Sequence, residues 1–378
     1  MRWKQGFELQ PHLLIALQGG GAYGSYQAGM LDEYFRQKGQ PYDGGYGVSV
    51  GALNVAQLFG TKSGTPEASL REQPANAASL AELWQKEITG NESVYKPYRS
   101  TGVVTEGARR ILGKGIFGDL AVAALRKQPA VYDTKPLRAL LEKNLAGRKW
   151  PRAVEVGAVN LELGRFFEIP LSAPSHGLTP LDAVMASAAI PIVFPPIEGF
   201  VDGGVTDVTP LRSVFNHFRE VRDERRSRNQ PEIRQELHVY RASSFPQPKR
   251  GPFDRVVKVL ERTLEIFVDN TDREDYERAA FINELAGKMH CTQVSADKKV
   301  KSEFVSWHRK YGLIDIYVIG PSKNEMGKFS DSSRNFSPKA IREGLILGRR
   351  RMADFLQNRD EYLLEVVLFN DDVPELGK

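Results

Sequence analysis

Ser49 occupies the centre of Gly47-Val48-Ser49-Val50-Gly51, which has the spacing G-x-S-x-G. In this pattern the serine sits on a sharp turn between a strand and a helix, and the two glycines remove side chains that would clash there. The turn presents the hydroxyl at a helix N-terminus, where the backbone dipole favours developing negative charge. The pattern therefore predicts a nucleophilic serine on a nucleophile elbow, with an ordinary small-residue turn as the alternative interpretation.

A serine nucleophile also needs backbone amides that stabilise the oxyanion of a tetrahedral intermediate. Gly19, Gly20 and Gly21 follow a short apolar run and precede an amphipathic segment. Three consecutive glycines at such a junction let main-chain amides approach a ligand closely. We expect these three residues to form the oxyanion hole, and a plain tight turn is the alternative.

Asp202 is the candidate base, because it begins a turn with Gly203 and Gly204 behind an apolar run. A carboxylate within hydrogen-bond reach of Ser49 can take its proton if burial raises the carboxyl pKa. None of the six histidines lies in a comparable turn, so the sequence does not predict a Ser-His-Asp triad. An Asx turn that only stabilises the backbone is the competing interpretation of Asp202.

The same glycine loop also matches the dinucleotide-binding motif G-x-G-x-x-G, as Gly19-x-Gly21-x-x-Gly24, and Asp43 follows about twenty residues further on. In that fold the acidic residue ends an apolar strand. The polar and glycine-bearing residues 36–42 before Asp43 are not a buried strand. An NAD(P)-binding oxidoreductase is therefore the less favoured reading.

Strands and helices must position these turns. Apolar runs and alternation predict strands at 13–17, 46–48, 154–159, 165–169, 200–201, 237–241 and 314–319, the third and fourth forming a hairpin. Helical periodicity predicts helices at 25–37, 50–59, 80–88, 136–145, 181–189 and 338–355. Residues 61–76 are polar, and we expect a loop there.

The composition bounds the class of protein. The 378 residues carry a net charge of +5 and are 41% hydrophobic, which is typical of a globular protein and does not imply nucleic-acid binding. The single cysteine, Cys291, excludes an intrachain disulfide and a cysteine-rich zinc site. Neither a signal peptide nor a membrane-spanning run is expected, so we predict a cytoplasmic protein that contacts membranes only peripherally.

The motifs together resemble the patatin-like phospholipase family. The resemblance covers residues 13–210 and rests on four segments in the family's order: Gln18 to Gly24, Gly47 to Asn54, Ala186 to Pro196 and Asp202 to Gly204. It implies an α/β fold with three layers (α/β/α) around a mainly parallel sheet, and acyl hydrolysis without a metal or other cofactor. It also implies that Ser49 and Asp202 are the catalytic dyad and that the glycine-loop amides are the oxyanion donors. Tyr23 stands where many members have a basic residue.

The predicted function is a serine acyl hydrolase that cleaves lipid carboxylic esters through an acyl-serine intermediate, in the manner of a phospholipase A or a lysophospholipase. An inert lipid-binding or scaffold protein on the same fold is the main alternative. The headgroup, the acyl chain and the oligomeric state are not determined by the sequence.

The chain is expected to divide into a catalytic domain over 10–245 and a mixed, largely helical C-terminal extension over 253–378 packed on it, joined by a proline-bearing linker. Residues 102–126 mix apolar and basic side chains, and we hypothesise that they form a mobile cover that opens on lipid. An ordinary packed helix is the alternative there.

Overall fold

The computed structural model describes residues 10–97, 128–244, 273–286, 288, 312–326, 333, 335–370 and 372–376. The hypothesised cover at 102–126 and the linker at 245–252 lie outside the described residues.

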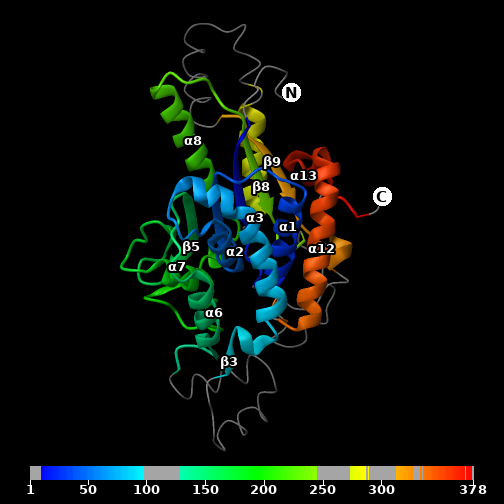
Figure 1. Ribbon diagram of the computed structural model, residues 1–378. Helices are drawn as coiled ribbons and strands as arrows, with labels where there is room; N and C mark the ends of the chain where they lie inside the picture. Colours follow the sequence, from blue (N-terminus) through cyan, green and yellow to red (C-terminus); the bar gives the residue numbers. More distant parts are fainter. Residues whose placement is uncertain are drawn as a thin grey trace, which may run out of the picture.

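A seven-stranded, mostly parallel sheet forms the centre of the molecule (Figure 1). Its strands run in the order β6 (Arg165–Pro170), β5 (Ala153–Asn160), β2 (Gly44–Val48), β1 (His12–Leu17), β8 (Gln235–Tyr240) and β9 (Asp315–Ile319), while β7 (Phe200–Asp202) pairs with β5. The pairs β5–β2, β2–β1, β1–β8 and β8–β9 are parallel, and β6 and β7 run antiparallel to β5. The predicted mainly parallel sheet is confirmed, as is the hairpin of β5 and β6.

Helices cover both faces of this sheet, because successive side chains of a strand point to opposite sides. On β1, Leu13, Ile15 and Leu17 belong to one hydrophobic cluster, which includes residues of α1 (Gly24–Arg36), α2 (Val50–Phe59), α3 (Pro66–Glu82), α6 (Lys135–Leu145), α7 (Pro180–Ser187) and α12 (Pro338–Gln357). Leu14 and Ala16 belong to a second cluster with α8 (Leu211–Ser227), α13 (Leu364–Asn370) and the helical residues 273–286. The fold therefore has the expected three layers, α/β/α.

Shorter elements connect the layers. They are the single turns η1 (Gly21–Tyr23), η3 (Asn91–Ser93), η4 (Gly203–Val205) and η5 (Arg359–Tyr362), the π-helical turn η2 (Leu83–Glu87), the short helix α11 (Lys323–Met326), and the two-stranded pair of β3 (Lys96–Pro97) and β4 (Tyr132–Asp133).

The predicted loop at 61–76 is wrong, because α3 begins at Pro66. Thr65 caps this helix by accepting a hydrogen bond from the Ala68 amide at 3.2 Å. Its buried face carries polar side chains that bind backbone carbonyls: Gln73 donates to Tyr42 at 2.9 Å and Asn76 donates to Leu58 at 2.9 Å. A helix that packs through amide side chains shows no apolar periodicity, so the sequence pattern did not reveal it.

The described parts of segment 253–378 belong to these same layers. Strand β9 extends the central sheet beside β8, and α12 packs along α1 (Figure 1). The two helices approach closely enough that a Cβ atom at Gly348 would overlap the carbonyl oxygen of Tyr26. The division of the chain at residues 245–253 stays a prediction.

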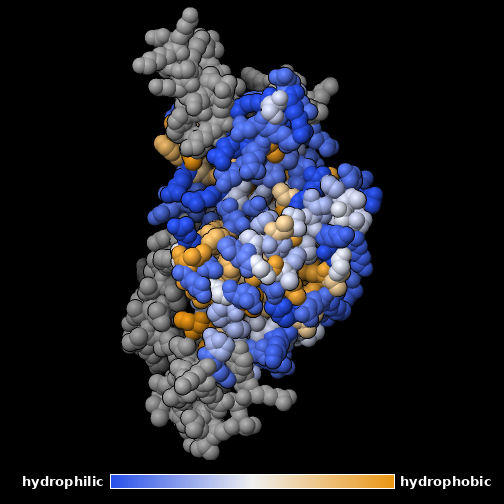
Figure 2. Space-filling view, turned by 90° about the vertical axis from the view of Figure 1, so that its left-hand side faces the viewer, coloured by the Kyte–Doolittle hydropathy of each residue, from blue (hydrophilic) through white to orange (hydrophobic). Residues whose placement is uncertain are grey.

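On the face shown in Figure 2, hydrophilic residues cover most of the described surface and hydrophobic residues form only small groups. Small groups of this kind are ordinary on a protein surface. None of the described helices has the length and apolar character required to cross a bilayer.

Candidate active site

Ser49 lies between the end of β2 and the start of α2, on a strained turn. Its φ of 55° and ψ of −124° are unusual for a residue with a side chain, and such conformations cost about 1–3 kcal/mol. The turn fits only because its neighbours are small: a Cβ atom at Gly51 would overlap the Leu17 carbonyl oxygen, and one at Gly47 would overlap the backbone of Gly51. The structure thus contains the strand-turn-helix geometry that the glycine spacing predicts.

Strand β5 brings Asp202 next to this turn. Val48, the last residue of β2, pairs with Gly157, and Asp202, the last residue of β7, pairs with the next residue, Ala158. Strands β2 and β7 therefore pair with successive parts of β5, residues 153–157 and residues 158–160. Asp202 lies beside Ser49 where the two strands meet. The Ser49 hydroxyl lies close enough to the Asp202 carboxyl to lower its pKa, and both side chains are buried.

Burial raises the pKa of the Asp202 carboxyl to about 6, although the nearby Ser49 hydroxyl and the hydrogen bond from the Gly204 amide oppose the increase. The Gly204 amide lies 2.8 Å from Oδ1. The Asp202 amide donates to the Ala189 carbonyl at 2.9 Å, which holds the turn in place. A carboxylate with this pKa is a stronger base than an exposed aspartate and is still ionised at neutral pH.

Ser187, at the end of α7, connects the serine turn to β5. Its Oγ accepts a hydrogen bond from the Ser49 amide at 3.0 Å and donates one to the Gly157 carbonyl at 2.6 Å. Ser187 lies in the motif from Ala186 to Pro196, but the sequence alone indicates no role for it. Its place in the small-residue segment from Ala186 to Pro191 was the only signal.

The glycine loop packs directly against Ser49, since a Cβ atom at Gly19 would lie 3.1 Å from the Ser49 Cβ. Its amides differ in what they bind. The Gly19 amide donates to Val208 at 3.2 Å. The amides of Gly20 and Gly21 donate to no acceptor within the described part of the chain, which leaves two donors beside the serine.

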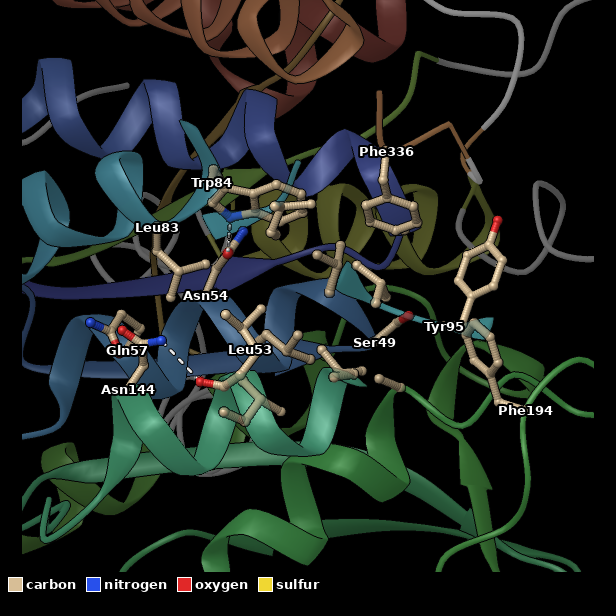
Figure 3. A pocket seen from close by; sticks show the side chains of 18 of the residues that line it. Ser49, Leu53, Asn54, Gln57, Leu83, Trp84, Tyr95, Asn144, Phe194 and Phe336 are labelled. Atoms are coloured by element: carbon tan, nitrogen blue, oxygen red, sulfur yellow. Dashed lines mark hydrogen bonds between the residues drawn. The ribbon is translucent and has the colours of Figure 1, made fainter. Parts of the chain in front are cut away.

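Ser49 lies on the wall of a pocket of about 870 Å³, a volume that includes open solvent at its mouth (Figure 3). The wall is almost entirely apolar, which is typical of a small-molecule site. It comes from α2, α3, η2, residues 88–95, α6, the loop after α7 and the segment before α12. Its large apolar residues include Leu53, Leu80, Leu83, Trp84, Ile88, Val94, Tyr95, Leu137, Leu140, Leu141, Val193, Phe194 and Phe336.

Aromatic side chains cluster on this wall. The rings of Trp84 and Phe336 stack with centroids 6.3 Å apart, and those of Tyr95 and Phe194 lie 5.5 Å apart. Phe336 belongs to segment 253–378, so this segment contributes directly to the pocket. The sequence did not indicate the pocket wall as a whole, although the leucines of α6, spaced by three and four residues, were a local signal of a buried helix face.

Asp43 and the described histidines, the other groups considered for chemistry, lie away from Ser49 and its pocket. Asp43 precedes β2, at the end of that strand opposite Ser49, and its carboxylate accepts a hydrogen bond from the Leu13 amide at 3.0 Å. A dinucleotide fingerprint would need this acid at the same edge as the glycine loop. The four histidines that the structure describes are absent from the pocket wall, and no metal-binding group of three or more acidic, histidine or cysteine side chains occurs among the described residues.

Comparison with known proteins gives the family. The model of the family described as "Patatin-like phospholipase" matches residues 15–215, more than half of the chain. Among solved structures, the crystal structure of VipD from Legionella pneumophila is similar at 14% sequence identity and a TM-score of 0.34, over 92% of this chain and 67% of that one. No curated protein matches. The match over residues 15–215 shows that this chain belongs to the patatin-like phospholipase family, a family of lipid acyl hydrolases.

Proposed function

We propose that this protein is a serine hydrolase of lipid carboxylic esters, of the phospholipase A or lysophospholipase type, with Ser49 and Asp202 as its catalytic dyad. The observation that carries the proposal is the position of the Ser49 hydroxyl beside the buried Asp202 carboxylate, at the wall of an apolar pocket. Family membership supports lipid acyl hydrolysis in general. The arrangement of Ser49 and Asp202 supports these two residues as the dyad and an acyl-serine intermediate as the route.

In the first step, the Asp202 carboxylate takes the proton of the Ser49 hydroxyl while Oγ attacks the ester carbonyl carbon. The carbonyl oxygen becomes an oxyanion, which the amides of Gly20 and Gly21 stabilise together with the positive end of α2. Asp202 then gives its proton to the departing alcohol oxygen, and the acyl group remains on Ser49.

In the second step, Asp202 takes a proton from a water molecule that attacks the acyl-serine carbonyl. The second tetrahedral intermediate collapses, Ser49 recovers its proton from Asp202, and the fatty acid leaves. The raised pKa of Asp202 suits it both to accept a proton from Ser49 or water and to return that proton to the leaving oxygen. A group that titrates near 6 can do both at neutral pH.

The pocket supports an acyl chain as the bound part of the substrate. Each methylene group that leaves water for an apolar wall contributes about 0.8 kcal/mol. A protein that acts on such esters withdraws its substrate from an aggregate or a membrane, so we also propose peripheral contact with lipid surfaces.

The test combines covalent labelling with product analysis. A fluorophosphonate probe should label the wild-type protein, and fatty acid should be released from a mixed phospholipid pool. Ser49→Ala should abolish both, and Asp202→Asn should reduce release by at least about a thousandfold. Ser213→Ala is a matched control, because Ser213 is a buried serine on α8, away from the pocket.

The inert lipid-binding alternative predicts lipid binding without labelling or release. Retention of NAD(P) on purification would instead support an oxidoreductase. Complete loss of release in a folded His176→Ala or His238→Ala variant would replace the dyad with a mechanism that needs histidine.

A further inference from the structure

Gln57 is buried and exposes only 3% of its surface, yet its side-chain Oε1 and Nε2 both lack a hydrogen-bond partner among the described residues. Buried polar groups are almost always hydrogen-bonded, so each exception calls for an explanation. Gln57 also lines the pocket that contains Ser49. A polar group that the protein leaves unpaired inside a ligand pocket is available to the ligand.

Other amides on the pocket wall are already bound within the protein. Asn54 donates to the Gly24 carbonyl at 3.0 Å and accepts from the Trp84 indole at 3.0 Å. Asn144 donates to the Leu140 carbonyl at 2.9 Å. These two side chains hold the wall together, whereas Gln57 has no such structural role.

The position of Gln57 relative to Ser49 follows from helix α2. Ser49, Leu53 and Gln57 are spaced by four residues and therefore follow one another along the same face of the helix. Figure 3 shows Gln57 beside Asn144 at one end of the pocket, with Leu53 between Gln57 and Ser49. Eight residues at about 1.5 Å each place Gln57 about 12 Å along the helix axis from the serine.

If an acyl chain is attached to Ser49 and runs along α2, the middle of that acyl chain lies beside Gln57. With C–C bonds of about 1.5 Å, an extended chain advances about 1.3 Å per carbon, so 12 Å corresponds to about the ninth or tenth carbon. The pocket wall along this path is apolar. A single polar substituent at that depth would meet the unpaired amide.

We propose that Gln57 is a specificity-determining residue that recognises a hydroxyl group near the middle of the acyl chain, so that the preferred substrates are esters of mid-chain hydroxy fatty acids. This inference rests on the proposed function and names its substrate class. A hydroxyl both donates and accepts, and so matches an amide whose oxygen and nitrogen are both free. A keto group would only accept, which leaves Oε1 unpaired.

The first experiment measures kcat/KM for glycerol esters of stearic, 2-hydroxystearic and 10-hydroxystearic acid. The wild-type protein should favour the 10-hydroxy ester over the stearoyl ester by about tenfold, because an unpaired polar site discriminates against a ligand that lacks the matching group. The 2-hydroxy ester should gain nothing, because its hydroxyl lies beside Ser49.

Gln57→Leu and Gln57→Met remove the amide at nearly constant volume and should reduce the 10-hydroxy to stearoyl ratio to about one or below. The ratio is internal to each variant, so it does not depend on the absolute rate. Leu83→Met alters the pocket wall without changing a polar group and should keep the wild-type ratio. A wild-type ratio near one, or a ratio that persists in both Gln57 variants, overturns the proposal and leaves a bound water as the partner of Gln57.

A second experiment separates this proposal from the proposed function. Binding of free stearate and of free 10-hydroxystearate to Ser49→Ala requires no catalysis, and Ser49→Ala with Gln57→Leu is the matched comparison. About tenfold tighter binding of the hydroxy acid, lost in the double variant, supports the role of Gln57 even if no ester is hydrolysed. Hydrolysis of all esters with equal binding of both acids contradicts the role of Gln57 and leaves the hydrolase intact.

Discussion

The backbone amide of Ser49 donates a hydrogen bond of 3.0 Å to the hydroxyl of Ser187, whose own proton goes to the Gly157 carbonyl at 2.6 Å. Gly157 is the residue of β5 that precedes Ala158, the partner of Asp202. A single hydroxyl from α7 therefore fixes the strained serine turn to the strand that also positions the proposed base. We therefore expect the geometry of the proposed dyad to depend on this connection.

Ser187→Ala should lower both stability and activity. The substitution leaves a buried amide and a buried carbonyl without their partner, which costs about 1–3 kcal/mol, and it frees the turn that carries Ser49. Urea unfolding and ester hydrolysis measure the two effects. Ser213→Ala is the matched control, because the Ser213 hydroxyl is buried without a partner among the described residues and should cost little or nothing. Equal behaviour of the two variants would contradict the role of Ser187.

The rate should depend on pH through Asp202. Its pKa is raised to about 6, mainly by burial, and the base must be ionised to accept the Ser49 proton. We therefore expect kcat/KM to rise about tenfold per pH unit below 6 and to level off above it. Glu155 has a pKa raised to about 7 by burial and by Glu168 and Glu220, but it does not line the pocket, so Glu155→Gln should keep the same profile. A profile that is flat between pH 5 and 7 would be inconsistent with Asp202 as the base.

Gly51→Ala should strongly destabilise the protein. The added Cβ would overlap the Leu17 carbonyl oxygen on β1, so either the strand or the serine turn must move. We expect a loss of about 3 kcal/mol or more, as for other overpacked sites, together with reduced soluble yield. Gly90→Ala is the matched control, since Gly90 has an extended backbone and no atom lies within 4 Å of its Cβ position among the described residues. A thermal unfolding temperature equal to that of Gly90→Ala would show that the turn tolerates a side chain.

Gly348→Ala should destabilise the contact between α12 and α1. Its Cβ would overlap the Tyr26 carbonyl oxygen, and the helices would have to separate. Because Phe336 precedes α12 and lines the pocket, we expect ester hydrolysis to fall along with the unfolding temperature. Ile346→Ala, at an exposed position of the same helix, should leave both nearly unchanged. If Gly348→Ala unfolds at the wild-type temperature, the close packing of these helices is not needed for the fold.

Much of the fold and part of the site could be predicted from local sequence. The apolar run of β1, the helix at 50–59, the cap at Ser337 and the glycine spacing of the turn at Ser49 are all features of a few consecutive residues. Glycine spacing encodes such turns directly, because only a residue without a side chain fits the close backbone contacts at positions 47 and 51. These short-range rules indicated Ser49 as a nucleophile and Asp202 as a candidate base, and the resemblance of the combined motifs to a known family implied that the two residues form a pair.

The rest was decided by contacts between residues far apart in the chain. The register of β5 brings Asp202 to Ser49, and Ser187 joins the Ser49 amide to Gly157 on that strand. Over residues 66–76, helix α3 buries small and amide side chains rather than large apolar ones, so its pattern resembled a loop. The pocket wall combines side chains from residue 21 to residue 336, and whether Gln57 has a partner depends on all of them. Local propensity carries no information about such contacts, because they form only when the layers pack and each side chain loses its water to a specific neighbour.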